Sequence, residues 1–197
     1  MMAFELNPAL AADSRVKSIG RLGDHVSTLE LATLVLLGVT AAVMSSYVRL
    51  GLRIPGHTIV LAVLPMAFGL AIVPRQLAGT TMSVSAMLTA ALLSASGVRY
   101  FGVGAMASIT AVGPLLDLAL ARARGGWRLY LGFVLAGFSA NMVAFSVRGG
   151  SKLLQVEGLG RRLFADWLSQ AAVTYVLAGA IAGLLSAACW FRMRNAR

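Results

Sequence analysis

GPLLDLALARARGGWRLYLGFVLAGFSANMVAFS, residues 113–146, decides the fold class of this chain. The stretch contains the end of one apolar segment, a basic turn with Arg122, Arg124 and Arg128, and a second apolar segment. A helix needs roughly 20 apolar residues to cross a bilayer, and segments of this kind and length flank the turn. The stretch therefore predicts two membrane-spanning helices joined by a short basic turn.

Composition extends this prediction to the whole chain. Of its 197 residues, 58% are hydrophobic and 12% are charged, whereas about 25% of the residues in soluble proteins are charged. Six apolar windows have the character of spans, and they cover residues 30–50, 58–74, 80–98, 101–121, 127–147 and 168–191. We therefore expect an all-α membrane protein: a six-helix bundle over residues 30–191 with kinked or short helices, a cytoplasmic or interfacial segment over 1–29, and a basic tail over 192–197.

The distribution of charge indicates orientation in the membrane. The 17 basic residues lie mostly at the ends of the predicted spans, so membrane anchoring explains them better than a nucleic-acid partner. Six spans put ten of them on the side of the termini and seven on the other, which favours cytoplasmic termini in the cell membrane. Cys189 is the one cysteine and there are two histidines, so we expect no metal site and no cofactor.

Two polar residues are the least expected ones inside the apolar windows. A charged group at membrane depth costs about 2.5 to 3.5 kcal/mol on insertion scales, so Asp117 should face the bundle or its cytoplasmic mouth, with Arg122 and Arg124 as counter-charges. The alternative role for these charges is a structural ion pair. Asn141 is expected to meet a ligand, or to hold two helices together through a hydrogen bond.

The connections on the side away from the termini supply further candidates. The first of them contains Arg53 and His57, and the second, residues 148–167, is predicted to form a short amphipathic helix that ends at Trp167. Short or broken spans often border a binding cavity, and the window that follows His57 is short, with a proline in its middle. We therefore place a candidate substrate site on that side, formed by Arg53, His57, Asn141 and Trp167.

Small residues recur every four positions in the first window, as Gly38, Ala42 and Ser46. Spacing of this kind brings them to one helix face and lets another helix approach closely, either within the chain or in a partner.

Motifs for catalysis fail on context. A Gly-x-Gly-x-x-Ala pattern at residues 102–107 has no preceding strand, which dinucleotide binding requires. GFSAN at residues 137–141 lacks the second glycine of a nucleophile elbow and lies inside a span. We therefore expect no enzymatic activity.

GPLLDLALARARGGWRLYLGFVLAGFSANMV, residues 113–143, resembles a segment of the substrate-binding membrane components (S components) of energy-coupling factor transporters. The similarity is distant and is strongest to the cobalt and nickel type, in which a Gly-Pro helix, a basic turn and an "AG…AN" helix follow one another. The resemblance implies six helices with cytoplasmic termini, a captured vitamin or metal, a transmembrane coupling subunit and cytoplasmic ATPases. It also implies that the Gly38, Ala42 and Ser46 face docks onto that coupling subunit.

One departure from the metal type concerns the substrate. Metal-type members coordinate their ion through a Met-His start, whereas this chain begins MMAFELNP and has its first histidine at position 25. A small organic micronutrient, a vitamin or its precursor, is therefore the expected substrate. Two other classes stay open: a non-transporting helical scaffold or partner anchor, and an intramembrane enzyme. A cavity lined by polar groups from several helices would favour the transport subunit. A core without such a cavity would favour the scaffold, and an acid and a base within hydrogen-bond reach of each other would favour the enzyme.

Overall fold

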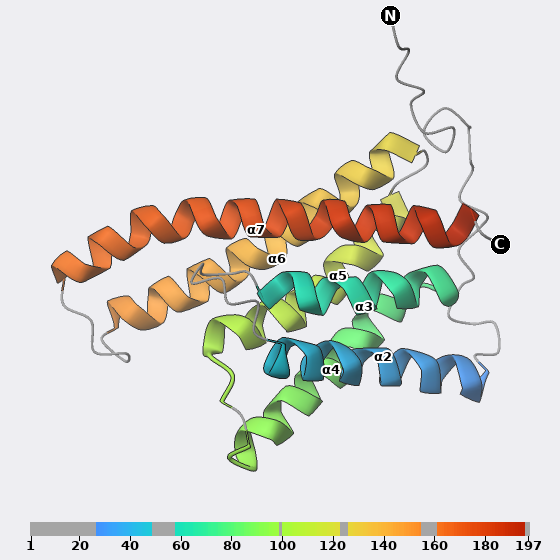
Figure 1. Cartoon of the computed structure of the whole chain (residues 1–197), viewed down its shortest axis with the longest axis horizontal. Helices are drawn as coiled ribbons and strands as arrows, with labels where there is room; N and C mark the ends of the chain where they lie inside the picture. Colours follow the sequence, from blue (N-terminus) through green and yellow to red (C-terminus); the bar gives the residue numbers. More distant parts are fainter. Residues whose placement is uncertain (1–26, 49–57, 99, 123–125, 155–160, 196–197) are drawn as a thin grey trace, which may run out of the picture.

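The computed structural model describes residues 27–48, 58–98, 100–122, 126–154 and 161–195. Within these ranges the chain forms six α-helices and no strand (Figure 1), and the helices are α2 (Thr28–Tyr47), α3 (Thr58–Ile72), α4 (Ala78–Ala95), α5 (Val103–Arg122), α6 (Gly126–Leu153) and α7 (Arg161–Asn195). Five of them are long and apolar enough to cross a membrane, and α3 is a shorter apolar helix. The prediction of an all-α membrane bundle is confirmed.

The outer surface of the bundle is apolar. Leu36 of α2, Leu92 of α4 and Leu177 of α7 are 65%, 70% and 55% exposed, and many other large apolar side chains are exposed with them. Soluble monomers rarely expose large contiguous apolar patches, whereas acyl chains are a suitable environment for such a surface. The long apolar helices and this exposed apolar surface are those of a multi-pass membrane protein.

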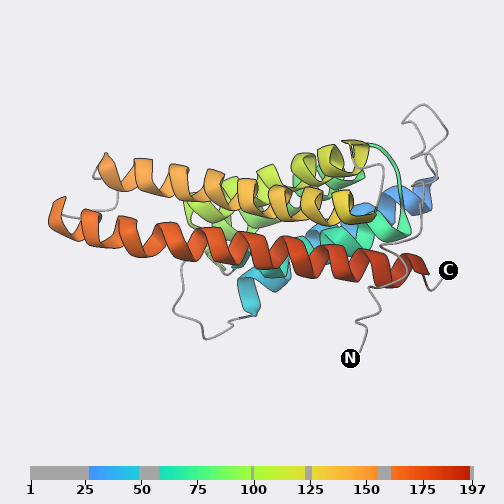
Figure 2. The ribbon, with the colours of Figure 1, turned by 90° about the horizontal axis from the view of Figure 1, so that it is seen from above.

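Successive helices alternate in direction. Helices α2, α4 and α6 begin at one end of the bundle, which we call the Thr28 end, and α3, α5 and α7 begin at the other, which we call the Tyr47 end (Figures 1 and 2). At the Thr28 end, Ser27 and Glu30 form a capping box at the start of α2. Glu30 also forms a salt bridge of 3.0 Å with Arg75, which precedes α4.

Helices α6 and α7 are longer than predicted. α6 continues to Leu153 and α7 begins at Arg161, so a separate amphipathic helix over residues 148–167 is wrong, although 155–160 lie outside the described residues. At 1.5 Å per residue the two helices are about 42 and 52 Å long, against about 30 Å of hydrocarbon. Figures 1 and 2 show both helices projecting beyond the others at the Tyr47 end. α7 also takes in most of the predicted basic tail.

Helix α3 lies at the centre of the bundle. It contacts each of the other five helices, and Phe68 is its only exposed side chain among those described. Met66, Ala67 and Leu70 are completely buried. Because helices rather than lipid surround α3, its 15 residues and its internal Pro65 do not leave backbone groups facing the hydrocarbon.

Helices α4 and α5 approach each other closely at Gly79 and Gly113. A Cβ atom on Gly79 would lie 2.6 Å from the carbonyl oxygen of Gly113, and a Cβ on Gly113 would overlap the carbonyl oxygen of Gly79. Both obstacles are backbone atoms, so no side-chain rotation could relieve them. Glycine at both positions is what allows this contact between the two backbones.

Candidate functional site

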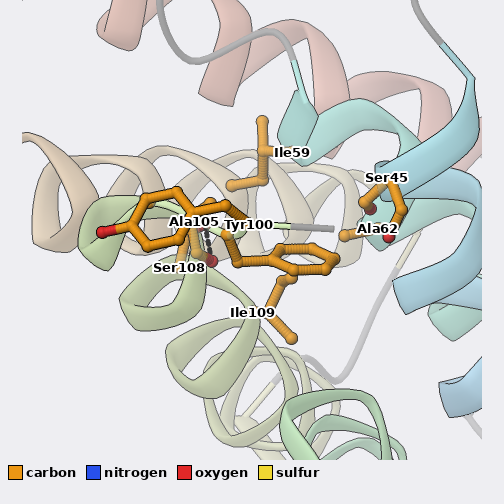
Figure 3. Close-up of a pocket in the computed structure, with 10 residues that line it drawn as sticks. Ser45, Ile59, Ala62, Tyr100, Ala105, Ser108 and Ile109 are labelled. Atoms are coloured by element: carbon orange, nitrogen blue, oxygen red, sulfur yellow. Dashed lines mark hydrogen bonds between the residues drawn. The ribbon is translucent and has the colours of Figure 1, made fainter. Parts of the chain in front are cut away.

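A cavity of about 200 Å³ lies at the Tyr47 end, between α2, α3 and α5. Figure 3 shows the side chains around it, and the lining consists of Ser45, Ser46, Ile59, Ala62, Tyr100, Phe101, Gly102, Ala105, Ser108 and Ile109. Two of the bordering helices, α2 and α3, are joined by the segment that contains Arg53 and His57. These two candidate residues lie outside the described residues.

Serine hydroxyls give the cavity its hydrogen-bonding character. Ser45 donates its proton to the carbonyl oxygen of Ala41 at 2.7 Å, and Ser108 donates to that of Ala105 at 2.9 Å. Each hydroxyl proton is therefore used within its own helix, while the hydroxyl oxygen keeps its capacity to accept. The cavity thus presents hydrogen-bond acceptors, which suit a ligand with an N–H or O–H group.

The remaining described wall is mainly apolar. Ile59, Phe101 and Ile109 are 2%, 7% and 3% exposed, and the backbone N–H of Phe101 is held by the hydroxyl of Ser94 at 3.3 Å. Tyr100 stands at the rim, with its hydroxyl directed away from Ile109 (Figure 3). Since an apolar cavity of about 150 Å³ holds benzene, this cavity has room for a ligand with about one ring.

Asp117 caps helix α4 from the neighbouring helix α5. Its Oδ1 accepts a hydrogen bond from the N–H of Gly79 at 2.8 Å, and its Oδ2 accepts two from Thr80, one from the N–H and one from the hydroxyl, both at 2.7 Å. The first N–H groups of a helix have no acceptor within that helix, and the residue before α4, Leu77, provides no side-chain cap. The carboxylate therefore satisfies the start of α4.

Arg122 does not form an ion pair with Asp117. Asp117 faces the bundle rather than lipid, but its two oxygens bond to α4, and Arg122 is exposed. The prediction that Arg122 balances this carboxylate is wrong, because backbone N–H groups and a hydroxyl take that place. Arg124 lies outside the described residues.

Ser83 forms a second polar contact between α4 and α5. Its hydroxyl donates to the carbonyl oxygen of Ile109 at 2.8 Å and accepts from the N–H of Gly113 at 2.8 Å. These two backbone groups are acceptor and donor one helical turn apart in α5, just before Pro114. A side chain of α4 therefore bonds to the backbone of α5, while Asp117 of α5 bonds to the backbone of α4.

Asn141 connects α6 with α7 and does not line the cavity. It is 1% exposed, and its Nδ2 donates to the carbonyl oxygen of Tyr175 at 2.6 Å. This geometry corresponds to the alternative of an interhelical hydrogen bond.

Trp167 belongs to the same pair of helices. Its ring stacks on that of Phe145 with centroids 5.7 Å apart, and Lys152 Nζ lies 5.2 Å from the ring centroid of Trp167. The structure therefore places Asn141 and Trp167 in the α6–α7 contact, away from the cavity lining.

The prediction that Gly38, Ala42 and Ser46 form an outward docking face is wrong. Gly38 is buried and faces Met82 and Ser85 of α4, Ala42 is completely buried, and Ser46 is 8% exposed. Small residues four positions apart permit close packing within a chain as well as between chains. Here this face packs within the chain, and Ser46 lines the cavity.

The sequence analysis placed none of the residues that line the cavity in the substrate site, and it assigned Ser46 to a docking face instead. Ala62 and Ala105 carry no chemical signal, and Ser45 and Ser108 resemble ordinary helical hydroxyls in the sequence. The only available signal was the coincidence of small residues near three span ends on the side away from the termini.

Comparisons with protein-family models, curated proteins and solved structures find no match for this chain.

Proposed function

We propose that this chain is the substrate-capture subunit of an uptake transporter of the energy-coupling factor type, and that it binds a small organic micronutrient in the cavity at the Tyr47 end. The observation that carries the proposal is the cavity itself, with serine oxygens from α2 and α5 and apolar walls from α3 and α5. With cytoplasmic termini the Tyr47 end faces outward, which is the side from which an imported substrate arrives.

The lining defines the class of substrate. A compact, uncharged molecule of about one ring fits the volume of about 200 Å³. An N–H or O–H group on it would bond to Ser45 and Ser108, and its apolar part would lie against Ile59 and Phe101. A vitamin or vitamin precursor of this size has that combination of groups.

The resemblance to S components also suggests partners, namely a transmembrane coupling subunit and cytoplasmic ATPases. Because the Gly38 face is buried within the chain, such a subunit would dock on one of the apolar outer faces. The exposed faces of α2 and α7 carry many large apolar side chains. A coupling subunit could pack against these side chains where lipid would otherwise contact them.

Filling the cavity tests the proposal. Ala105→Leu adds three carbon atoms to the cavity wall, whereas Ala91→Leu makes the same change at an exposed position on α4. Both variants and the wild type would be purified from native membranes, and small molecules that co-purify would be identified by mass spectrometry. We expect a compound that accompanies the wild type and Ala91→Leu and is lost with Ala105→Leu.

Retention of every compound by Ala105→Leu, with unchanged thermal stability, would contradict the proposal. Ser108→Ala adds a second measurement, because it removes an acceptor while leaving the cavity open. A substrate with a donor group should bind this variant about fivefold more weakly, as expected when a hydrogen bond of about 1 kcal/mol is lost.

A scaffold remains the second candidate, and a specific observation favours it. The polar groups that are unusual inside the spans, Ser83, Asp117 and Asn141, all bond to neighbouring helices. A bundle built to hold its own helices together would have this pattern. Co-purification of protein partners without any small molecule would support the scaffold and oppose substrate capture.

A further inference from the structure

A second hollow, of about 260 Å³, lies between α5 and α6 toward the Thr28 end. It is an open groove, and apolar side chains such as Leu118, Leu131 and Leu135 line most of it. Leu118, Leu131 and Leu135 are 43%, 48% and 52% exposed, so the groove opens onto the surface that faces lipid.

Two arginines lie at one end of this groove. Arg122 is the last residue of α5 and Arg128 is in the first turn of α6, so both line the groove from helix ends at the Thr28 end. Both are exposed. Among the described residues no carboxylate forms a salt bridge with either of them, and the salt bridge that the described residues do form joins Glu30 and Arg75 outside the groove lining. The sequence adds Arg124 to the same turn.

The length of the groove matches one leaflet of a bilayer. Ser139 lines its other end, eleven residues after Arg128 on the same helix, which is about 16 Å at 1.5 Å per residue. Half of the hydrocarbon thickness is about 15 Å. If Ser139 lies near the middle of the bilayer, the arginines at the other end of the groove lie at the depth of the lipid headgroups, and the apolar part between them lies at the depth of the acyl chains.

An aromatic side chain marks the same level. Trp127 is 61% exposed, and the guanidinium carbon of Arg128 lies 5.7 Å from the centroid of its ring. Exposed tryptophan is enriched where the hydrocarbon meets the headgroups. Trp127 thus indicates that Arg128 lies at the interface, and it supplies an optical probe next to an arginine that lines the groove.

We propose that the α5–α6 groove binds an anionic phospholipid, with the phosphate between Arg122 and Arg128 and an acyl chain against Leu118, Leu131 and Leu135. Arginine matches phosphate oxygens with paired donors, and basic pockets between spans at a membrane surface bind anionic headgroups. No described carboxylate neutralises these two arginines. A zwitterionic headgroup carries a cation beside its phosphate and so has no net charge to neutralise them. The charge of the groove therefore selects the anionic lipid.

Quenching of Trp127 by brominated lipids tests this inference. The full chain would be reconstituted in phosphatidylcholine vesicles containing either brominated phosphatidylglycerol or brominated phosphatidylcholine at equal fractions. The variant Trp127→Phe assigns the part of the fluorescence that belongs to this position. We expect phosphatidylglycerol to quench Trp127 more strongly at every lipid fraction.

Charge-matched variants separate the groove from general attraction to an anionic surface. Arg122→Gln and Arg128→Gln each remove one positive charge from the groove, and Arg192→Gln removes one from the exposed surface of α7 at the same end. Each groove variant should lower the preference for phosphatidylglycerol about fivefold, as expected at about 1 kcal/mol per basic residue near the surface. Arg192→Gln should leave the preference unchanged.

Equal quenching of the wild type by the two lipids would overturn the proposal, as would an equal loss of preference in all three arginine variants. Ser139→Phe tests the acyl part, because it fills the deep end of the groove without changing charge. We expect weaker quenching of Trp127 by both lipids in this variant, and unchanged quenching would contradict a chain seated in the groove.

Discussion

Asp117 and Thr80 are 37 residues apart in the sequence, and two hydrogen bonds of 2.7 Å join them across the α4–α5 contact. One of these bonds comes from the hydroxyl of Thr80 and the other from its backbone N–H. A third bond comes from the N–H of Gly79. Through these three bonds Asp117 of α5 caps the first turn of α4. The donors at the start of α4 therefore account for an acidic residue inside a span.

Replacing Asp117 with asparagine should destabilise the bundle. The amide keeps one acceptor oxygen but directs an N–H₂ group at donors, so at least one buried N–H loses its partner. We expect the free energy of unfolding to fall by about 2 to 3 kcal/mol, since bonds to charged groups and unsatisfied donors each cost in that range. Thr80→Val removes only the hydroxyl bond and should cost about 1 kcal/mol. Denaturant titration in detergent gives both values, and equal stability of Asp117→Asn and the wild type would contradict the capping role.

Gly113 should tolerate no side chain. In Gly113→Leu the new atoms meet the backbone oxygen of Gly79 and the hydroxyl of Ser83, so α4 and α5 must separate. We expect a loss of about 3 kcal/mol, at the upper end of the usual cost of overpacking. Gly150→Ala is the control, because a Cβ there meets no atom within 4 Å. Thermal unfolding followed by circular dichroism compares the two variants, and similar melting temperatures would show that the helices can separate at little cost.

Asn141 should affect stability without affecting ligand capture. Asn141→Ala removes the hydrogen bond to the carbonyl oxygen of Tyr175, and polar bonds between spanning helices are worth about 0.6 kcal/mol on average and about 1.7 at most. We expect about 1 kcal/mol of lost stability and an unchanged set of co-purifying small molecules. Ala105→Leu should give the reverse pattern. Loss of a bound compound in Asn141→Ala at full stability would return Asn141 to the binding site.

Leu77 offers a change that should stabilise the chain. It precedes α4 with a φ of 63°, a left-handed conformation that costs roughly 1 to 2 kcal/mol for residues with a Cβ atom. Since its side chain is 50% exposed, Leu77→Gly should raise the free energy of unfolding by about 1 kcal/mol. Leu77→Ala keeps the Cβ and serves as the control. A lower melting temperature for Leu77→Gly than for Leu77→Ala would contradict this conformational cost.

Hydropathy predicted the spans well because each window has to face lipid or other apolar helices. The second window, predicted over 58–74, is α3 over Thr58–Ile72, and the fourth, predicted over 101–121, is α5 over Val103–Arg122. The last two helices were predicted too short, since their extensions at the Tyr47 end include polar residues. A helix that leaves the hydrocarbon loses the apolar signal but keeps its backbone hydrogen bonds.

The roles of single residues were harder to predict than the spans. Asp117 and Asn141 were correctly identified as unusual. Their partners, however, belong to other helices and lie 34 to 38 residues away in the sequence. Spacing along one helix carries no information about such partners. The Gly38 face has the same spacing whether it meets α4 or another protein. The cavity residues share no motif, because three separate helix ends bring them together.

The central place of α3 has a consequence for biogenesis. α3 is made early, yet α7, one of the helices it packs against, is synthesised after the other five described helices. Until α7 has entered the membrane, the part of the α3 surface that α7 covers has only lipid or the insertion machinery beside it. The bundle therefore cannot be completed one hairpin at a time in the order of synthesis, and a nascent chain that stops before residue 161 lacks part of the enclosure of its own core.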